Sequence, residues 1–89
     1  MSDTVEVIKQ IVVGLKRSPE LTAQLHDRTN LIDEVRLDSL ELLQLMLELE
    51  DKLAIQIDFE ALEFSHLHSI ERLAGFLDSM PPLPKAGGA

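Results

Sequence analysis

Three segments of the chain repeat apolar residues at the spacing of an α-helix, and shorter irregular segments separate them. Helices are expected over about Thr4 to Lys16, from the residue after Asp38 to Leu53, and from the residue after the N-cap Ser69 to about Leu77. In the first and last of these helices the inward-facing residues are Val5, Ile8, Val12 and Leu15, then Ile70, Leu73, Ala74 and Leu77. The pattern predicts an all-α fold.

The first predicted helix ends at Ser18-Pro19, because proline has no amide hydrogen and disfavours a helical conformation in the residue before it. Pro19 can open a short helical turn that extends through Leu25. The segment from His26 to Leu37 has no sustained period and is expected to be a long loop. Three apolar residues are expected to hold this loop against the core: Leu31, Ile32 and Val35.

The segments around the last predicted helix are short. Residues 54–58 alternate apolar and polar positions and are expected to form an extended link without a partner strand. Phe59 to Glu63 can form one helical turn. After Met80 the chain is rich in proline, glycine and alanine, so residues 80–89 are expected to be a disordered tail. We therefore predict one domain over residues 1–79.

The central helix has two distinct faces. Asp38 is expected as its N-cap, with Glu41 three residues later completing a capping box. The core-facing stripe consists of Leu42, Leu45, Met46, Leu49 and Leu53. The solvent-facing side carries Glu41, Gln44, Glu48 and Asp51, with Leu40 and Leu47 beside them. These two leucines next to an acidic row suggest a docking surface, although isolated exposed leucines are also common.

The net charge of −8 is concentrated in the middle of the chain. From Asp33 to Glu63 there are ten acidic residues and two basic ones, which accounts for the whole net charge. A region of one sign attracts basic protein surfaces and repels nucleic acid, whose phosphates require lysine and arginine. Solubility is the simpler explanation of the acids, but it would not require them to be localised. DNA or RNA binding is disfavoured.

Several kinds of function lack the residues they need. The chain has no cysteine, hence no thiolate nucleophile, and no glycine-rich phosphate loop. Its three histidines do not form a metal-ligand pattern, and no pair of acids is placed to act as general acid and base. No apolar run approaches the ~20 residues of a membrane span, and the N-terminus does not resemble a secretory leader. We expect a cytoplasmic, monomeric, non-enzymatic protein of 89 residues.

Ser39 stands at the first position of the central helix, where backbone amides lack intrahelical partners and the helix dipole is positive. A phosphate ester formed on its hydroxyl would lie where anions are favoured. Ser39 could instead serve only to cap the helix. The long loop before it, the acidic row and the flanking leucines all converge on this residue, which favours a functional role.

The run from Leu31 to Leu53, with Asp38-Ser39-Leu40 at its centre, resembles the acyl carrier protein family. Residues 49–57 and 68–73 extend the likeness, which covers roughly Val5 to Leu77. In that family the serine of Asp-Ser-Leu bears 4′-phosphopantetheine at the start of the second helix of a four-helix bundle. The resemblance implies an acyl-carrier-type bundle with a long loop between helices 1 and 2 and a short third helix.

The resemblance also implies roles for individual residues. Ser39 matches the modified serine, and Asp38 matches the acid that helps to engage the phosphopantetheinyl transferase and its magnesium. Ile57 and Leu62 match positions that line the groove toward the third helix. The face implied to meet basic patches on loading ligases or transferases and on synthase or condensing enzymes consists of Leu40, Glu41, Gln44, Leu47, Glu48 and Asp51. The arm would supply the thiol that the cysteine-free chain lacks.

The chain departs from the family pattern in several places. Arg36 stands where glycine is common two residues before the aspartate, so the loop must suit a side chain or accept strain there. Ala54 stands where glycine often ends the helix, and a left-handed cap at alanine would cost energy. Gln44 is neutral where an acid is usual, and Leu53 replaces a phenylalanine.

Three functions remain open from the sequence. The first is a discrete acyl carrier protein of a fatty acid, polyketide or other specialised pathway, holding acyl groups as thioesters. The second is an aminoacyl or peptidyl carrier loaded by an adenylating ligase. The third is a helical interaction module without a prosthetic group.

Overall fold

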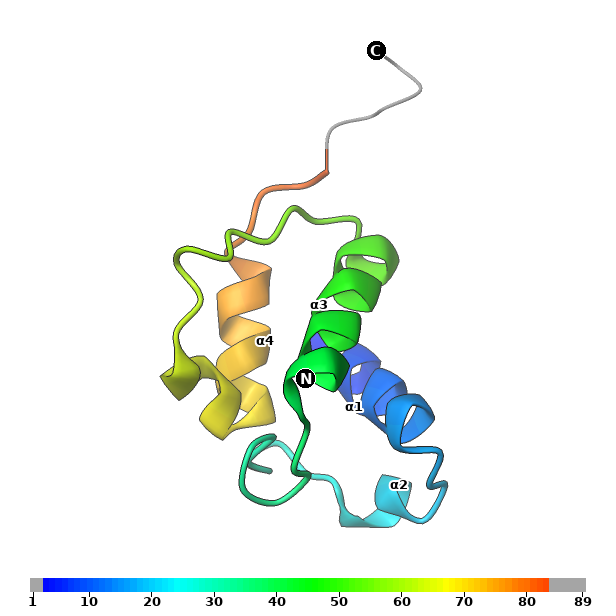
Figure 1. The fold of residues 1–89 in the computed structure, drawn as a ribbon. Coiled ribbons are helices and arrows are strands. Elements are labelled where there is room, and N and C mark those ends of the chain that lie inside the picture. Colours follow the sequence, from blue (N-terminus) through cyan, green and yellow to red (C-terminus); the bar gives the residue numbers. More distant parts are fainter. Residues whose placement is uncertain (1–2, 84–89) are drawn as a thin grey trace.

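The computed structural model describes residues 3–83 and shows a helical protein (Figure 1). Its elements are α1 (Asp3–Lys16), α2 (Leu21–Gln24), α3 (Ser39–Leu53), the 3₁₀ helix η1 (Phe64–His68) and α4 (Ile70–Asp78). Within the described residues there is an isolated β-bridge but no strand. The all-α class, the three main helices and the short turn after Pro19 are confirmed.

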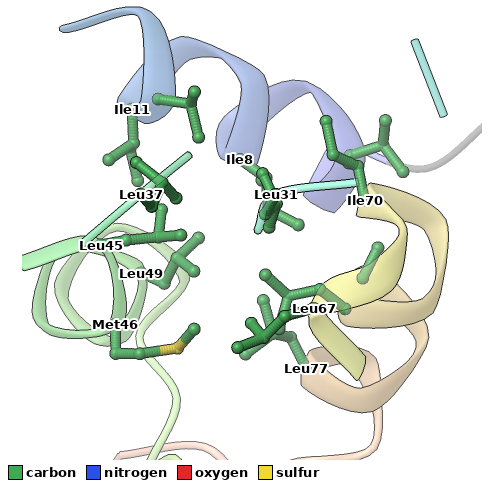
Figure 2. Close-up of a cluster of buried hydrophobic side chains, with 14 of the residues drawn as sticks. Ile8, Ile11, Leu31, Leu37, Leu45, Met46, Leu49, Leu67, Ile70 and Leu77 are labelled. Atoms are coloured by element: carbon green, nitrogen blue, oxygen red, sulfur yellow. The ribbon is translucent and has the colours of Figure 1, made fainter. Parts of the chain in front are cut away.

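The core lies between α1, α3 and α4, whose apolar side chains point toward a common centre (Figure 2). The least exposed side chains come from all three helices and from the long loop: Ile8, Val12, Leu31, Leu45, Leu49, Ile70, Leu73 and Leu77. Burying each such side chain contributes roughly 1.5–3 kcal/mol. The predicted stripe of α3 is confirmed, although its outer members Leu42 and Leu53 are only partly buried.

The long loop between α2 and α3 is held against this core, as predicted. Leu31 is fully buried, Val35 is buried and Ile32 is partly buried. The amide of Leu31 also donates to the carbonyl of Leu67 at 3.0 Å. The loop is therefore fixed to η1 by its backbone as well as by its side chains.

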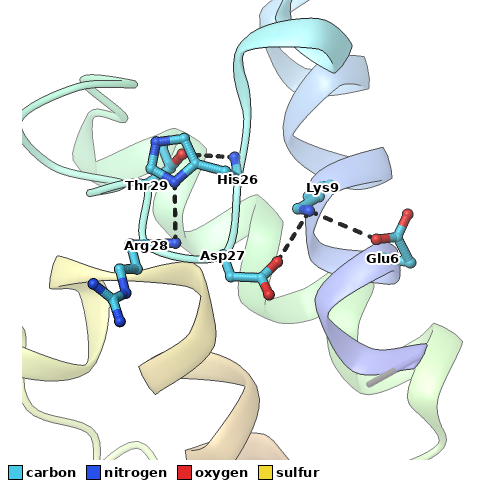
Figure 3. Close-up of polar contacts among 6 residues, drawn as sticks. All are labelled: Glu6, Lys9, His26, Asp27, Arg28 and Thr29. Carbon is cyan, nitrogen blue, oxygen red and sulfur yellow. Dashed lines mark hydrogen bonds and ion pairs between the residues drawn. The ribbon is translucent and has the colours of Figure 1, made fainter. Parts of the chain in front are cut away.

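The first part of the loop is joined to α1 and α4 by polar contacts, and Figure 3 shows those within the loop and to α1. Thr29 is buried, and its Oγ1 accepts the amide hydrogen of His26 at 2.8 Å. The carbonyl of Thr29 accepts the amide hydrogen of Ile70, the first residue of α4. Lys9 of α1 pairs with Asp27 at 3.2 Å. These contacts fix the beginning of the loop, whereas Ser39 follows its end.

The third helix does not lie where the sequence pattern placed it. Residues 59–61 form a turn and residues 62 and 63 are not helical. In this turn the carboxylate and the carbonyl of Asp58 accept the amide hydrogens of Glu60 and Ala61. The helical segment is Phe64–His68, where Nδ1 of His66 accepts the amide hydrogen of Glu63 at 2.9 Å. The prediction of a short third helix is confirmed, but its position was wrong by about one turn.

The link after α3 has a partner that the sequence did not suggest. Ile55 forms an antiparallel bridge with Pro82. On either side of the bridge is an amide-to-carbonyl hydrogen bond of 2.9 Å, from Gln56 to Pro81 and from Leu83 to Ala54. The expectation that this link pairs with nothing was therefore wrong. Residues 81–83 of the predicted tail lie along the link, and residues 84–89 lie outside the described part.

Among residues 3–83, three residues other than glycine adopt the left-handed backbone region: Arg17, Arg36 and Ala54, with φ of 52°, 61° and 53°. The last two are the positions where glycine was expected from the family pattern. A side chain in this region costs roughly 1–2 kcal/mol. The chain therefore accepts backbone strain on both sides of α3.

Replacing Ala54 with glycine is expected to stabilise the fold by about 1 kcal/mol, because glycine adopts φ of 53° without a Cβ clash. Urea unfolding followed by circular dichroism measures the change. Ala61→Gly is the matched control, since Ala61 is exposed in a turn and has no positive φ. Ala61→Gly should leave stability unchanged or lower it, and an equal effect of both substitutions would contradict the strain at Ala54.

Candidate functional site

The start of α3 is built by a reciprocal pair of hydrogen bonds around Ser39. Asp38 has extended backbone (φ −84°, ψ 177°), and its Oδ1 accepts the amide hydrogen of Glu41 at 2.8 Å. In return, Oε1 of Glu41 accepts the amide hydrogen of Asp38 at 3.0 Å. The predicted capping box is thus confirmed. It uses the side chains of Asp38 and Glu41 and leaves the Ser39 side chain exposed.

The Glu41 carboxylate is also bound by a residue outside α3. Lys16, the last residue of α1, places Nζ 2.8 Å from Oε1 of Glu41 and 3.1 Å from the carbonyl oxygen of Arg36. Leu37, between Arg36 and the cap, is buried. The sequence analysis missed Lys16, and the residues it joins are too far apart in the chain for any periodic pattern to reveal the contact.

This arrangement changes the acidity of Glu41. The hydrogen bond from Lys16, followed by that from the Asp38 amide, lowers the pKa of the Glu41 carboxyl from its ordinary value of 4.5. The charged carboxylate therefore stabilises the fold above about pH 4.5, and this contribution is lost as the pH falls through the lowered pKa.

Glu41→Gln is expected to lower the thermal unfolding midpoint at pH 7 while keeping the capping geometry, because an amide oxygen can still accept the Asp38 hydrogen. The difference from the parent should shrink as the pH falls below about 4.5. Differential scanning calorimetry across pH 3 to 7 tests this. Glu48→Gln is the control, since Glu48 is exposed on α3 and forms no ion pair within residues 3–83. If the difference in unfolding midpoint between Glu41→Gln and the parent stayed constant at all pH values, the ionic contribution of Glu41 would be contradicted.

The predicted docking residues divide into two groups. Gln44, Glu48 and Asp51 are exposed on α3. Leu40 is 64% exposed and Leu47 is 53% exposed, as expected for residues outside the core. Glu41 differs from the others, because its side chain is only 21% exposed and is bound to Lys16.

Leu43 belongs to the same exposed apolar row and was missed by the sequence analysis. It is 50% exposed and lies between Leu40 and Leu47 at helical spacing of three and four residues. The helical period that placed Leu40 outside the core stripe also places Leu43 there, so the signal was present. After the role predicted for most of these exposed residues, we use the name α3 docking surface for Leu40, Leu43, Gln44, Leu47, Glu48 and Asp51.

The geometry around Ser39 suits a covalently attached phosphate. Its hydroxyl is exposed, and the amides of Ser39 and Leu40 have no hydrogen-bond partner within residues 3–83. Such amides and the positive end of the helix dipole favour an anion. Oδ2 of Asp38 also makes no hydrogen bond in this part of the chain, so it is available to a cation from outside.

A comparison with protein families decides the class of the site. The family model described as the phosphopantetheine attachment site matches residues 7–77, which is most of the chain. The chain belongs to this family. It is therefore a phosphopantetheine-carrying carrier protein, and the bundle is of the acyl-carrier type. No curated protein and no solved structure matches the chain.

The family supplies the general properties of the carrier. It is an attachment site for covalent 4′-phosphopantetheine, and the exposed hydroxyl and unpaired amides at the start of α3 fit that group. Carrier domains are not themselves catalytic and interact with modifying and synthase enzymes. No helix among residues 3–83 is long and apolar enough to cross a membrane.

Proposed function

We propose that the carrier bears 4′-phosphopantetheine on Ser39 and holds acyl groups for partner enzymes of a fatty acid, polyketide or other specialised pathway. When bound, the arm supplies a thiol that carries the acyl group as a thioester. The observation that carries this proposal is the exposed hydroxyl of Ser39 on the first residue of a 15-residue helix inside the matched region.

The other serines of the described chain are less suited to modification. Ser18 and Ser79 donate their hydroxyl hydrogens to Glu20 and to the Phe76 carbonyl, and Ser69 is a buried N-cap. Ser65 is exposed but lies inside the five-residue η1. Ser39 combines an exposed hydroxyl with the free amides of a long helix.

The neighbouring residues have separate roles in this proposal. Asp38 keeps Ser39 at the helix start through Oδ1 and offers Oδ2 to the magnesium of a phosphopantetheinyl transferase. The α3 docking surface offers exposed leucines and acids to basic, partly apolar patches on the transferase, on the loading ligase or transferase and on condensing enzymes. The carrier performs no chemical step itself.

Coexpression with a promiscuous phosphopantetheinyl transferase, followed by intact-mass spectrometry, tests the proposal. We expect the protein to gain the mass of one phosphopantetheine. A protein that gains no such mass would contradict the proposal and would favour the alternative of a helical interaction module. Carrier isolated with its cargo from its native cell distinguishes an acyl group from an aminoacyl or peptidyl group, since the latter would indicate loading by an adenylating ligase.

A further inference from the structure

We infer that Lys16 is a positioning residue for the modification of the carrier: its ammonium holds the backbone on both sides of Ser39 in the geometry that the transferase requires. This inference rests on the proposed attachment to Ser39. It concerns a residue of α1 that lies outside the α3 docking surface.

The ammonium of Lys16 joins two points that lie on either side of the serine. It donates to the Arg36 carbonyl at 3.1 Å, three residues before Ser39, and to Oε1 of Glu41 at 2.8 Å, two residues after it. The side chains of Lys16 and Glu41 are 24% and 21% exposed, so water only partly screens the pair. One cation therefore restrains both ends of the segment that carries the hydroxyl.

The first contact acts on a strained residue. Arg36 has φ of 61°, a backbone conformation that glycine adopts freely but that is strained for a residue with a Cβ atom. The Lys16 ammonium donates a charge-assisted hydrogen bond to the Arg36 carbonyl, which favours this conformation over unstrained conformations of the loop. If the peptide rotated, the chain entering Asp38 would change direction.

The second contact acts through the capping box. Oε1 of Glu41 accepts hydrogens from both Lys16 and the Asp38 amide, while the Glu41 amide donates to Asp38. Lys16 therefore limits the rotation of the Glu41 side chain, which accepts the amide hydrogen of Asp38. Asp38 in turn precedes Ser39 directly. Small displacements of a reacting group lower a rate strongly, so this restraint should affect the chemical step.

The test measures transfer from coenzyme A to purified apo carrier, with the carrier as the varied substrate. We expect Lys16→Met to lower kcat about tenfold and to leave KM within about twofold, because the α3 docking surface is intact. Lys16→Arg should restore most of the kcat, since a guanidinium can donate to the same two oxygens. Combining Lys16→Met with Glu41→Gln should lower kcat no further than Lys16→Met alone.

Lys9→Met is the matched control. Lys9 is also a lysine of α1 bound to two acids, at 3.6 Å to Glu6 and 3.2 Å to Asp27 (Figure 3). It lies about two turns before Lys16 on α1 and forms no ion pair with Glu41. Lys9→Met changes the net charge by the same amount as Lys16→Met, and it should leave kcat unchanged. Circular dichroism at the assay temperature confirms that each variant is folded.

Amide hydrogen exchange gives a readout that does not depend on the transferase. In Lys16→Met the amides of Asp38 and Glu41 should exchange faster, whereas the Arg72 amide, capped by Ser69, should not change. An unchanged kcat, an equal loss in Lys9→Met, a loss confined to KM, or a loss that Lys16→Arg does not relieve would overturn the inference. Failure of the parent to be modified would instead overturn the attachment to Ser39.

Discussion

Ser39→Ala is expected to abolish the gain of phosphopantetheine completely, with the fold unchanged. The substitution removes the one oxygen that would form the phosphate ester. It leaves the capping box in place, because Asp38 and Glu41 make those hydrogen bonds without the Ser39 side chain. Alanine is also a better helix former than serine at an exposed position. Intact-mass spectrometry after coexpression with the transferase measures the loss, and far-UV circular dichroism measures the fold.

Ser65→Ala is the control for this experiment. Ser65 is the other described serine that is exposed and makes no hydrogen bond with the rest of residues 3–83, so its loss should leave the mass gain intact. If Ser39→Ala gained as much mass as the parent, the arm would be attached elsewhere and the proposed site would be wrong.

Reversing Glu48 and Asp51 to lysine together is expected to lower kcat/KM for modification at least about tenfold at low salt. Both residues are exposed on α3, and neither forms an ion pair within the described chain, so helicity should be retained. The loss of kcat/KM should come mainly from a higher KM. The difference in kcat/KM between variant and parent should become smaller as salt is added, because the Debye length falls from about 10 Å at 0.1 M to about 3 Å at 1 M.

Glu41 is omitted from this reversal because its carboxylate holds Lys16 and the Asp38 amide, so a change there would alter structure as well as charge. Asp3→Lys with Glu71→Lys is the control: both residues are exposed, lie on α1 and α4, and change the net charge by the same amount. An equal loss in this control would show that overall charge, and not the α3 docking surface, governs the encounter.

The helices and the cap could be predicted because their causes are local. An apolar residue in each turn identified the buried faces of α1 and α4, and Asp38 followed by Glu41 identified the start of α3. The strain at Arg36 and Ala54 could also be anticipated, since a glycine position occupied by another residue leaves few backbone choices. These features depend on residues at most a few positions apart.

The features that the sequence did not reveal depend on distant residues. Lys16 meets Glu41 only because α1 packs against α3, and Ile55 meets Pro82 only because α4 returns the chain to the link. The third helix begins further along the chain than expected for two reasons. Asp58 accepts the amide hydrogens of Glu60 and Ala61 in a turn, and the burial of Leu67 favours a helix over residues 64–68. Local helix propensity favours the earlier segment, since alanine, leucine and glutamate are better helix formers than serine and histidine. The Asp58 turn and the burial of Leu67 therefore override local propensity.

The bridge between Ile55 and Pro82 has a practical consequence for handling the protein. It holds Leu83 beside Ala54, at the end of α3 opposite to Ser39 (Figure 1). A helix of 15 residues separates these ends by about 22 Å at 1.5 Å per residue. A solid support or fusion partner joined through this end of the chain would therefore leave the serine facing away from the anchor. Immobilised carrier should remain open to soluble enzymes.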